Sequence, residues 1–145
     1  MPARILIADA DRRLSEVYHA HLQDLGLAVR TAADGVDCIA LLRAFRPDLL
    51  LLGTSLPWGG CDGVLALLEE EPDLRPESVI ILADRSDCHI LYRVAPFHIG
   101  DFLFKPLSPA RLEQYLQELL GACSDSASPG LAAKELSHRW QNCFP

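Results

Sequence analysis

Short, mostly apolar runs alternate along the chain with longer stretches in which apolar residues recur at helical spacing. An apolar run of roughly four to eight residues is too short for a helix and predicts a buried strand. Five such strands are predicted, at residues 4–8, 27–32, 48–53, 78–83 and 101–104. The third run contains consecutive leucines at 49–52, which is typical of a central parallel strand covered on both faces.

The stretches between these strands predict amphipathic helices, because their apolar residues return every three or four positions. Asp11 is predicted to cap the first helix and Gly26 to end it. Its apolar stripe consists of Leu14, Val17, Tyr18, Leu22 and Leu25. Further helices are predicted from residue 36 to before Pro47, at 62–71, at 87–95 and around 112–120. The pair Asp34-Gly35 is interpreted as a turn.

Five strands alternating with five helices predict the α/β class, as a three-layer α/β/α doubly wound parallel sheet. Parallel strands need crossover connections, and these are right-handed. Ligands of such sheets bind outside the carboxyl ends of the strands, at the topological switch point. The residues expected at that edge are Asp9, Ala10, Gly53, Ala83 and Lys105.

Composition and charge narrow the classes of function. The 145 residues carry a formal net charge of −7, whereas a protein that binds nucleic acid needs a basic face to displace counterions from phosphates. No apolar run approaches the roughly 20 residues of a membrane span, and the first run is too short for a signal peptide. We therefore expect a cytoplasmic protein with neither a nucleic-acid nor a membrane partner.

The cysteines indicate neither a metal site nor a disulfide framework. There are five, an odd number, and they lie far apart at Cys38, Cys61, Cys88, Cys123 and Cys143. A closed zinc site is built from ligand pairs at short spacing. We interpret all five thiols as free, buried or incidental, and we expect no metal and no cofactor.

The composition changes after residue 121. Small and polar residues at 122–130 predict a linker, and residues 131–140 have the apolar spacing of a short helix. So short a helix is marginal alone and needs a surface to pack on. The expected organisation is a domain at 3–121 followed by a linker and a short helical tail at 122–145.

Several motifs, in the same order along the chain, resemble the receiver domain of response regulators of the chemotaxis-regulator type. They lie at residues 5–9, 31–35, 46–52, 56–57, 62–63 and 101–106, and the resemblance covers about 3–121. It implies a flavodoxin-like sheet with strand order 2-1-3-4-5. It also implies a role in bacterial two-component, or phosphorelay, signal transduction.

The resemblance implies a chemistry that this chain lacks in part. In the family, a histidine kinase passes a phosphoryl group to an aspartate after strand three, beside a Mg²⁺ held by two acids after strand one. The first acid matches Asp9, but the second falls on Ala10 and the phospho-acceptor on Gly53. Glycine offers no nucleophile. The resemblance therefore indicates a degenerate pseudo-receiver without a catalytic residue, with Asp11 and Asp84 as the two candidates to replace a metal ligand.

The remaining family positions are also altered. The two switch positions, a hydroxyl residue after strand four and an aromatic in strand five, fall on Ala83 and Phe102. The family lysine matches Lys105, which has no acceptor to pair with. An unpaired buried charge is costly, so we expect Lys105 to pair with Asp9, with Asp84 as the alternative partner. Trp58 is either an exposed loop aromatic or a plug over the vacated pocket.

The leading hypothesis is a stand-alone, non-enzymatic receiver-like domain that acts through protein–protein contacts. The expected partner is a histidine kinase, another signalling protein or a second copy of the chain. It is expected to bind the face formed by the fourth helix, fifth strand and fifth helix. That face comprises Ile90, Tyr92, Arg93, Phe102, Arg111, Gln114 and Glu118.

Three alternatives remain open. In the first, the domain is phosphorylated at a non-standard aspartate, Asp48 or Asp62. In the second, it senses a small ligand in the remodelled crevice. The third is a flavodoxin-type FMN binder, for which the acidic residues 9–11 are unfavourable because they would repel a phosphate.

Overall fold

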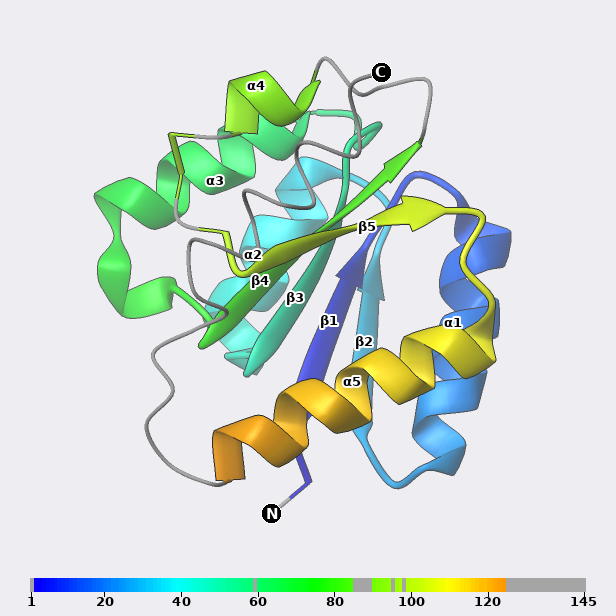
Figure 1. The fold of residues 1–145 in the computed structure, drawn as a ribbon. Coiled ribbons are helices and arrows are strands. Elements are labelled where there is room, and N and C mark those ends of the chain that lie inside the picture. Colours follow the sequence, from blue (N-terminus) through cyan, green and yellow to red (C-terminus); the bar gives the residue numbers. More distant parts are fainter. Residues whose placement is uncertain (1, 59, 85–89, 95, 98, 125–145) are drawn as a thin grey trace. The chain divides into compact units, whose positions relative to one another are not determined.

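The computed structural model describes residues 2–58, 60–84, 90–94, 96–97 and 99–124 (Figure 1). The chain divides into two compact units, residues 1–105 and 106–145, and each is described by itself. The described residues of the first unit contain the sheet, four α-helices and one short 3₁₀ helix, and those of the second contain one helix.

The first unit is built on a five-stranded parallel sheet with the order β2-β1-β3-β4-β5 (Figure 1). Its strands are β1 (Arg4–Ala8), β2 (Ala28–Ala32), β3 (Leu49–Gly53), β4 (Ser78–Asp84) and β5 (Asp101–Lys105). The predicted strands are confirmed with small shifts at their ends, and so is the strand order that the resemblance implied.

The helices of this unit are α1 (Arg12–Asp24), α2 (Gly35–Phe45), α3 (Gly60–Glu70) and α4 (Ile90–Val94). A short 3₁₀ helix, η1 (Pro72–Leu74), follows α3 and was not predicted. The β1-to-β2 and β2-to-β3 connections cross the sheet in opposite directions, so right-handed crossovers place α1 and α2 on opposite faces. Both faces of β1 are therefore covered. Residues 87–89 and 95 of the predicted fourth helix lie outside the described residues.

Two aspartates begin the helices at the carboxyl edge of the sheet. Asp11 caps α1 as predicted, since its Oδ1 accepts a hydrogen bond from the Leu14 N–H at 3.2 Å. Asp34 caps α2 in the same way, accepting from the Asp37 N–H at 2.7 Å. Asp34-Gly35 is therefore a helix start, and its interpretation as a simple turn was wrong.

The core follows the strands closely, and the four leucines of β3 are at most 1% exposed. The predicted stripe of α1 is partly wrong, because Val17 and Leu25 are 51% and 43% exposed while Tyr18 and Leu22 are buried. Val17 lies about 100° around the helix from Tyr18. Leu25 follows the last helical residue, and Ser15 takes a buried place on the stripe instead.

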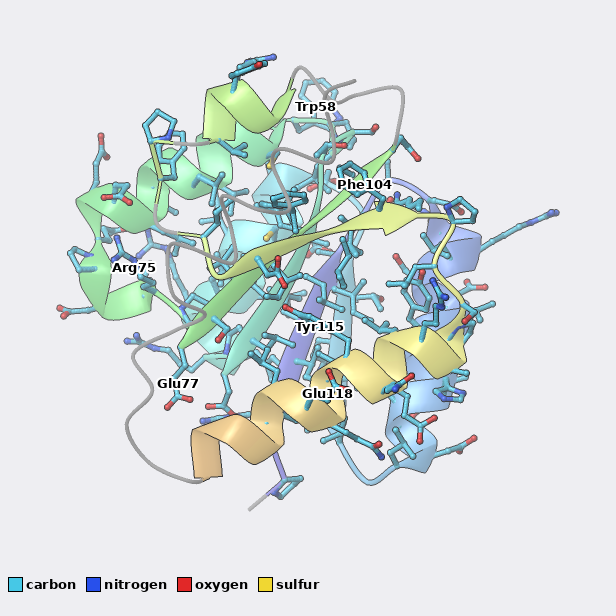
Figure 2. The ribbon with its side chains drawn as sticks, viewed as in Figure 1. Trp58, Arg75, Glu77, Phe104, Tyr115 and Glu118 are labelled. Atoms are coloured by element: carbon cyan, nitrogen blue, oxygen red, sulfur yellow. The ribbon has the colours of Figure 1, made fainter. Side chains whose placement is uncertain are left out.

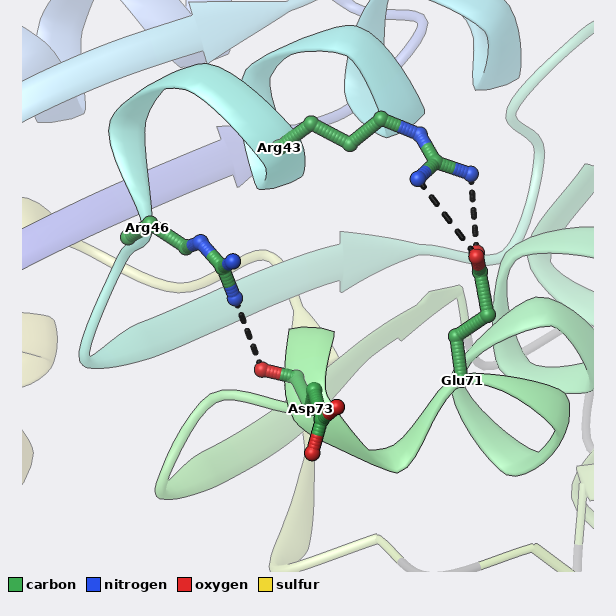
Figure 3. A network of polar contacts seen from close by, with 4 residues as sticks. All are labelled: Arg43, Arg46, Glu71 and Asp73. Atoms are coloured by element: carbon green, nitrogen blue, oxygen red, sulfur yellow. Dashed lines mark hydrogen bonds and ion pairs between the residues drawn. The ribbon is translucent and has the colours of Figure 1, made fainter.

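An exposed polar network links α2 to the segment after α3 (Figure 3). The Arg43 guanidinium donates to the two carboxylate oxygens of Glu71 at 2.8 and 3.5 Å, and Arg46 donates to the Asp73 carbonyl at 2.8 Å. Arg46 ends α2 in a left-handed conformation, with φ of 52°. Because the ionic groups are exposed, the network adds little stability.

The second unit contains α5 (Pro109–Ser124). Ser108 caps it, since the hydroxyl oxygen accepts from the Arg111 N–H at 3.2 Å. Leu112 and Leu116 of the predicted stripe are buried. The helix runs into the start of the predicted linker. The predicted tail helix at 131–140 lies outside the described residues, and the proposed boundary after 121 stays a prediction.

Candidate functional site

Three strand ends bring the predicted site residues together at one edge of the sheet. Asp9 follows β1, Gly53 ends β3 and Lys105 ends β5. Ala8 pairs with Leu52 in the sheet, so Asp9 comes beside Gly53. Both β3 and β4 lie between β1 and β5, and the long lysine side chain crosses that separation to reach Asp9.

The charged centre of the site is an ion pair between Lys105 and Asp9. The Lys105 Nζ lies 2.6 Å from Asp9 Oδ2, which confirms the predicted pairing. The side chains of Lys105 and Asp9 are 14% and 2% exposed. The other oxygen, Oδ1, accepts from the Asp11 N–H at 2.9 Å. Oδ2 accepts no hydrogen bond of regular geometry from the described residues, so its contact with Lys105 is best regarded as a close ion pair.

Gly53 lies directly against this carboxylate. A Cβ built on Gly53 would lie 2.6 Å from Asp9 Oδ2, 2.8 Å from Asp9 Cγ and 3.3 Å from the Ala8 carbonyl oxygen. Real Cβ atoms do not approach neighbours as closely as the first two distances. The Asp9 carboxylate therefore occupies the space in which a side chain at position 53 would begin.

The neighbouring positions do not complete a Mg²⁺ site. Ala10 and Ala83 have no side-chain oxygen, Asp11 caps α1, and Asp84 is the half-buried last residue of β4. Within the described ranges, no three His, Cys, Asp or Glu side chains gather where they could hold a metal ion. Mg²⁺ prefers an octahedral set of oxygen ligands. The residues present do not fit that ion.

Tyr18 is a member of the site region that the sequence did not reveal. It was predicted only as part of the apolar stripe of α1, and it is fully buried there. Burial, and to a smaller extent the carboxylates of Asp9 and Asp11, together raise the pKa of Tyr18 to about 12. Its phenol therefore stays protonated and neutral at physiological pH. The sequence feature that could have identified Tyr18 is its position about two turns after Asp11, on the helix that Asp11 caps.

The loop after β3 lies beside the start of α2, where the Gly35 N–H donates to the Pro57 carbonyl at 2.8 Å. Trp58 follows in a left-handed conformation, with φ of 54°, and is 76% exposed. Figure 2 shows it beyond the carboxyl end of the sheet. Trp58 is thus an exposed loop aromatic, and the alternative of a plug over the pocket was wrong.

The two alternative acceptor aspartates are engaged elsewhere. Asp48 precedes β3 at the opposite, amino edge of the sheet, where its Oδ2 accepts from the Arg4 N–H at 2.8 Å. Asp62 lies in the first turn of α3 and forms an ion pair with Arg93 of α4. Neither lies at the end of β3.

The predicted interaction residues differ in exposure. Phe102 was expected on the contact face, but it is 1% exposed and packs edge-on against Phe104 at a ring distance of 5.4 Å, so it belongs to the core. Tyr92 is 63% exposed, and Arg93 is exposed beside Asp62. The Ile90 side chain lies outside the described part. On α5, Arg111, Gln114 and Glu118 are exposed.

A known protein family matches most of the chain. The family described as "Response regulator receiver domain" matches residues 5–117. The chain belongs to this family. It is a receiver domain of the two-component response regulators. No described helix of this receiver is both long and apolar enough to cross a bilayer.

Curated relatives of the receiver are longer proteins. The probable transcriptional regulator ycf27 of Cyanophora paradoxa is 29% identical over 119 residues, which are 81% of this chain and 48% of that protein. The response regulator MprA of Mycobacterium sp. (strain KMS) is 32% identical over 133 residues, 89% of this chain and 55% of its own length. This chain spans about half the length of the curated relatives it matches.

Solved structures share the fold. The chemotaxis response regulator CheY4 of Vibrio cholerae superposes with a TM-score of 0.73 at 21% identity, over 81% of this chain and 98% of that one. The signal receiver domain of a histidine kinase from Syntrophus aciditrophicus gives a TM-score of 0.74 at 26% identity, over 90% and 98% of the two chains.

Proposed function

We propose that this receiver does not accept a phosphoryl group and that it signals through protein contacts. The observation that carries the proposal is Gly53 at the end of β3, with the Asp9 carboxylate in the space of its missing side chain. Acyl-phosphate formation needs a carboxylate oxygen that can attack the phosphorus of a donor. Position 53 supplies no such atom.

The nearest carboxylate is a poor substitute. Asp9 is 2% exposed, one of its oxygens lies on Lys105, and the other accepts from the Asp11 N–H. An attacking oxygen must reach the donor in line with the bond that breaks. The burial and the two contacts of Asp9 oppose that approach, and Asp48 and Asp62 are held by other partners.

The test is incubation with acetyl phosphate and, separately, with beryllofluoride, each with Mg²⁺. We expect no gain of mass by one phosphoryl group and no rise in the thermal midpoint. A receiver with aspartate at the acceptor position, treated in parallel, shows that the donor is active. A stoichiometric adduct, located by peptide mapping, would contradict the proposal.

Protein contact is the remaining route for a signal, and two exposed groups of residues support it. Tyr92 and Arg93 lie on α4, and Arg111 lies on α5. Aromatic and arginine side chains are enriched where interfaces gain most of their binding energy. We infer that a histidine kinase or another signalling protein binds one of these helices.

Charge reversal tests the two helices separately. Arg93→Glu is expected to weaken binding to purified histidine kinases of the same organism at least about tenfold, as for a hot-spot residue. Because Arg93 pairs with Asp62, the matched control is Asp62→Asn, which breaks the same ion pair and leaves the arginine. Equal losses in both variants would assign the effect to the ion pair. Arg111→Glu examines α5 in the same assay, and unchanged affinity in all variants would move the interface elsewhere.

A further inference from the structure

We propose that Gly53 is a positioning residue: its lack of a side chain is what allows Asp9 to pair with Lys105, and this pair sets the state of the site. The first part stands on geometry alone. The second part rests on the proposed function, because it assigns to a permanent ion pair the place that a transient phosphoryl group would take.

The approach of Asp9 to Gly53 leaves no space for even one methyl group. A Cβ at position 53 would lie 2.6 Å from Asp9 Oδ2, the same oxygen that lies 2.6 Å from the Lys105 amine. Any residue other than glycine at position 53 therefore collides with the atom that pairs with lysine. The φ of Gly53 lies outside the left-handed region, so the backbone itself would accept another residue.

Asp9 cannot make room by moving as a whole. Its backbone N–H donates to the Ala32 carbonyl at 3.0 Å, which extends the pairing of β1 with β2. Its Oδ1 is held by the Asp11 N–H at 2.9 Å. The available response is rotation of the carboxylate away from Lys105, which breaks the ion pair and that hydrogen bond together.

Such a rotation separates two charges in a site that is almost closed to water. The Asp9 side chain is only 2% exposed, so its carboxylate regains little hydration even where the flexible stem of Lys105 carries the amine toward water. Separation of a buried pair is strongly unfavourable for that reason. The pair thus connects the ends of β1 and β5, in a geometry that a Cβ at position 53 would not accommodate.

The experiment compares two glycine-to-alanine substitutions. Gly53→Ala is expected to lower the thermal midpoint by about 5 °C or more. In a domain of this size, each kcal/mol of lost stability lowers the midpoint by a few degrees. Gly63→Ala is the matched control, because Gly63 lies inside α3 and its added Cβ would meet nothing within 4 Å. It should leave the midpoint unchanged or raise it slightly, since alanine is the better helix former.

A second variant makes the result specific to Asp9. In an Asp9→Ala background the colliding carboxylate is gone, so Gly53→Ala should cause little further loss. The same double variant tests the proposal if Gly53→Ala alone does not fold, because folding should then be recovered. An equal loss in both backgrounds would assign the effect to the Ala8 carbonyl oxygen, 3.3 Å from the built Cβ, and overturn the proposal.

The ion pair itself is followed by the ¹⁵N signal of the Lys105 ammonium, which is visible by NMR when the group is held and shielded from exchange. We expect the signal in the wild-type protein and in Gly63→Ala, and its loss in Gly53→Ala. A signal that persists in Gly53→Ala contradicts the proposal. These measurements use no phosphodonor, so a phosphoryl adduct on the wild-type chain would refute the proposed function and leave the geometric part intact.

Discussion

The buried charge of Asp9 needs a partner more than the charge of Lys105 does. The carboxylate is 2% exposed and sits at the end of a short side chain, whereas the lysine is 14% exposed and ends a flexible stem. A lysine can extend its amine toward water while its methylene groups stay packed. An aspartate at the end of a buried strand has no such freedom.

This asymmetry gives a prediction about single substitutions. Lys105→Met is expected to destabilise the domain by about 3 kcal/mol, because it leaves the Asp9 carboxylate buried and unpaired. Asp9→Asn should cost less, about 1 kcal/mol, since the freed lysine reaches solvent. Urea unfolding measures both, with Lys105→Arg as the variant that keeps the charge. A larger loss for Asp9→Asn than for Lys105→Met would show that the lysine is the more dependent partner.

The residues of the site and its central ion pair could be predicted from the sequence, but its other contacts could not. Asp9, Gly53 and Lys105 follow predicted strands, and the carboxyl ends of parallel strands share an edge. The distance from Asp9 to the missing Cβ of Gly53 depends on the rotamer of one side chain, which no pattern in the sequence encodes. The pairing of Asp62 with Arg93 joins two separate helices and was missed for the same reason.

At the scale of elements, the strands were more predictable than the helix ends. The apolar runs of the strands have few other interpretations, whereas Asp34-Gly35 is equally suited to a turn and to a capped helix start. The exposure of Val17 and the burial of Phe102 were also missed. Both depend on which part of an element meets its neighbours, and spacing alone indicates this only approximately.

The helices α2 and α3 each carry a buried thiol, which gives a second prediction. Burial raises the pKa of Cys38 and of Cys61 to about 12, and the nearby carboxylates Asp37 and Asp62 act in the same direction. Both thiols should therefore stay protonated and unreactive toward iodoacetamide at mildly alkaline pH. Peptide mass spectrometry after labelling of the folded protein checks this.

Denaturant provides the control for the labelling. Both cysteines should react fully once guanidinium unfolds the chain. Asp37→Asn should not make Cys38 reactive, because burial is the larger cause of its raised pKa. Labelling of Cys38 in the folded protein at the rate of the unfolded chain would contradict the prediction.

At the scale of the whole molecule, stability should fall at high pH because of Tyr18. Its pKa is raised from 10 to about 12 by burial and by Asp9 and Asp11, so the folded protein holds the phenol proton more tightly than the unfolded chain does. The resulting stabilisation is complete below pH 10 and is lost as the pH rises toward 12.

Tyr18→Phe separates this effect from general alkaline unfolding. The variant has no phenol to ionise, so the decline of its urea midpoint between pH 10 and 12 should be shallower than that of the wild type. Tyr92→Phe, at a residue 63% exposed, is the matched control and should keep the wild-type slope. Equal slopes for wild type and Tyr18→Phe would remove Tyr18 as the cause.

Under the proposed function, the glycine at the end of β3 also changes how long a message lasts. An acyl phosphate acts as a timer, because its hydrolysis ends the signal without any change in the amount of protein. Position 53 carries no atom that could hold such a bond. The occupancy of a partner then follows the concentration of the domain relative to the dissociation constant. Synthesis and degradation of the protein, and not a chemical half-life, would set when the message begins and ends.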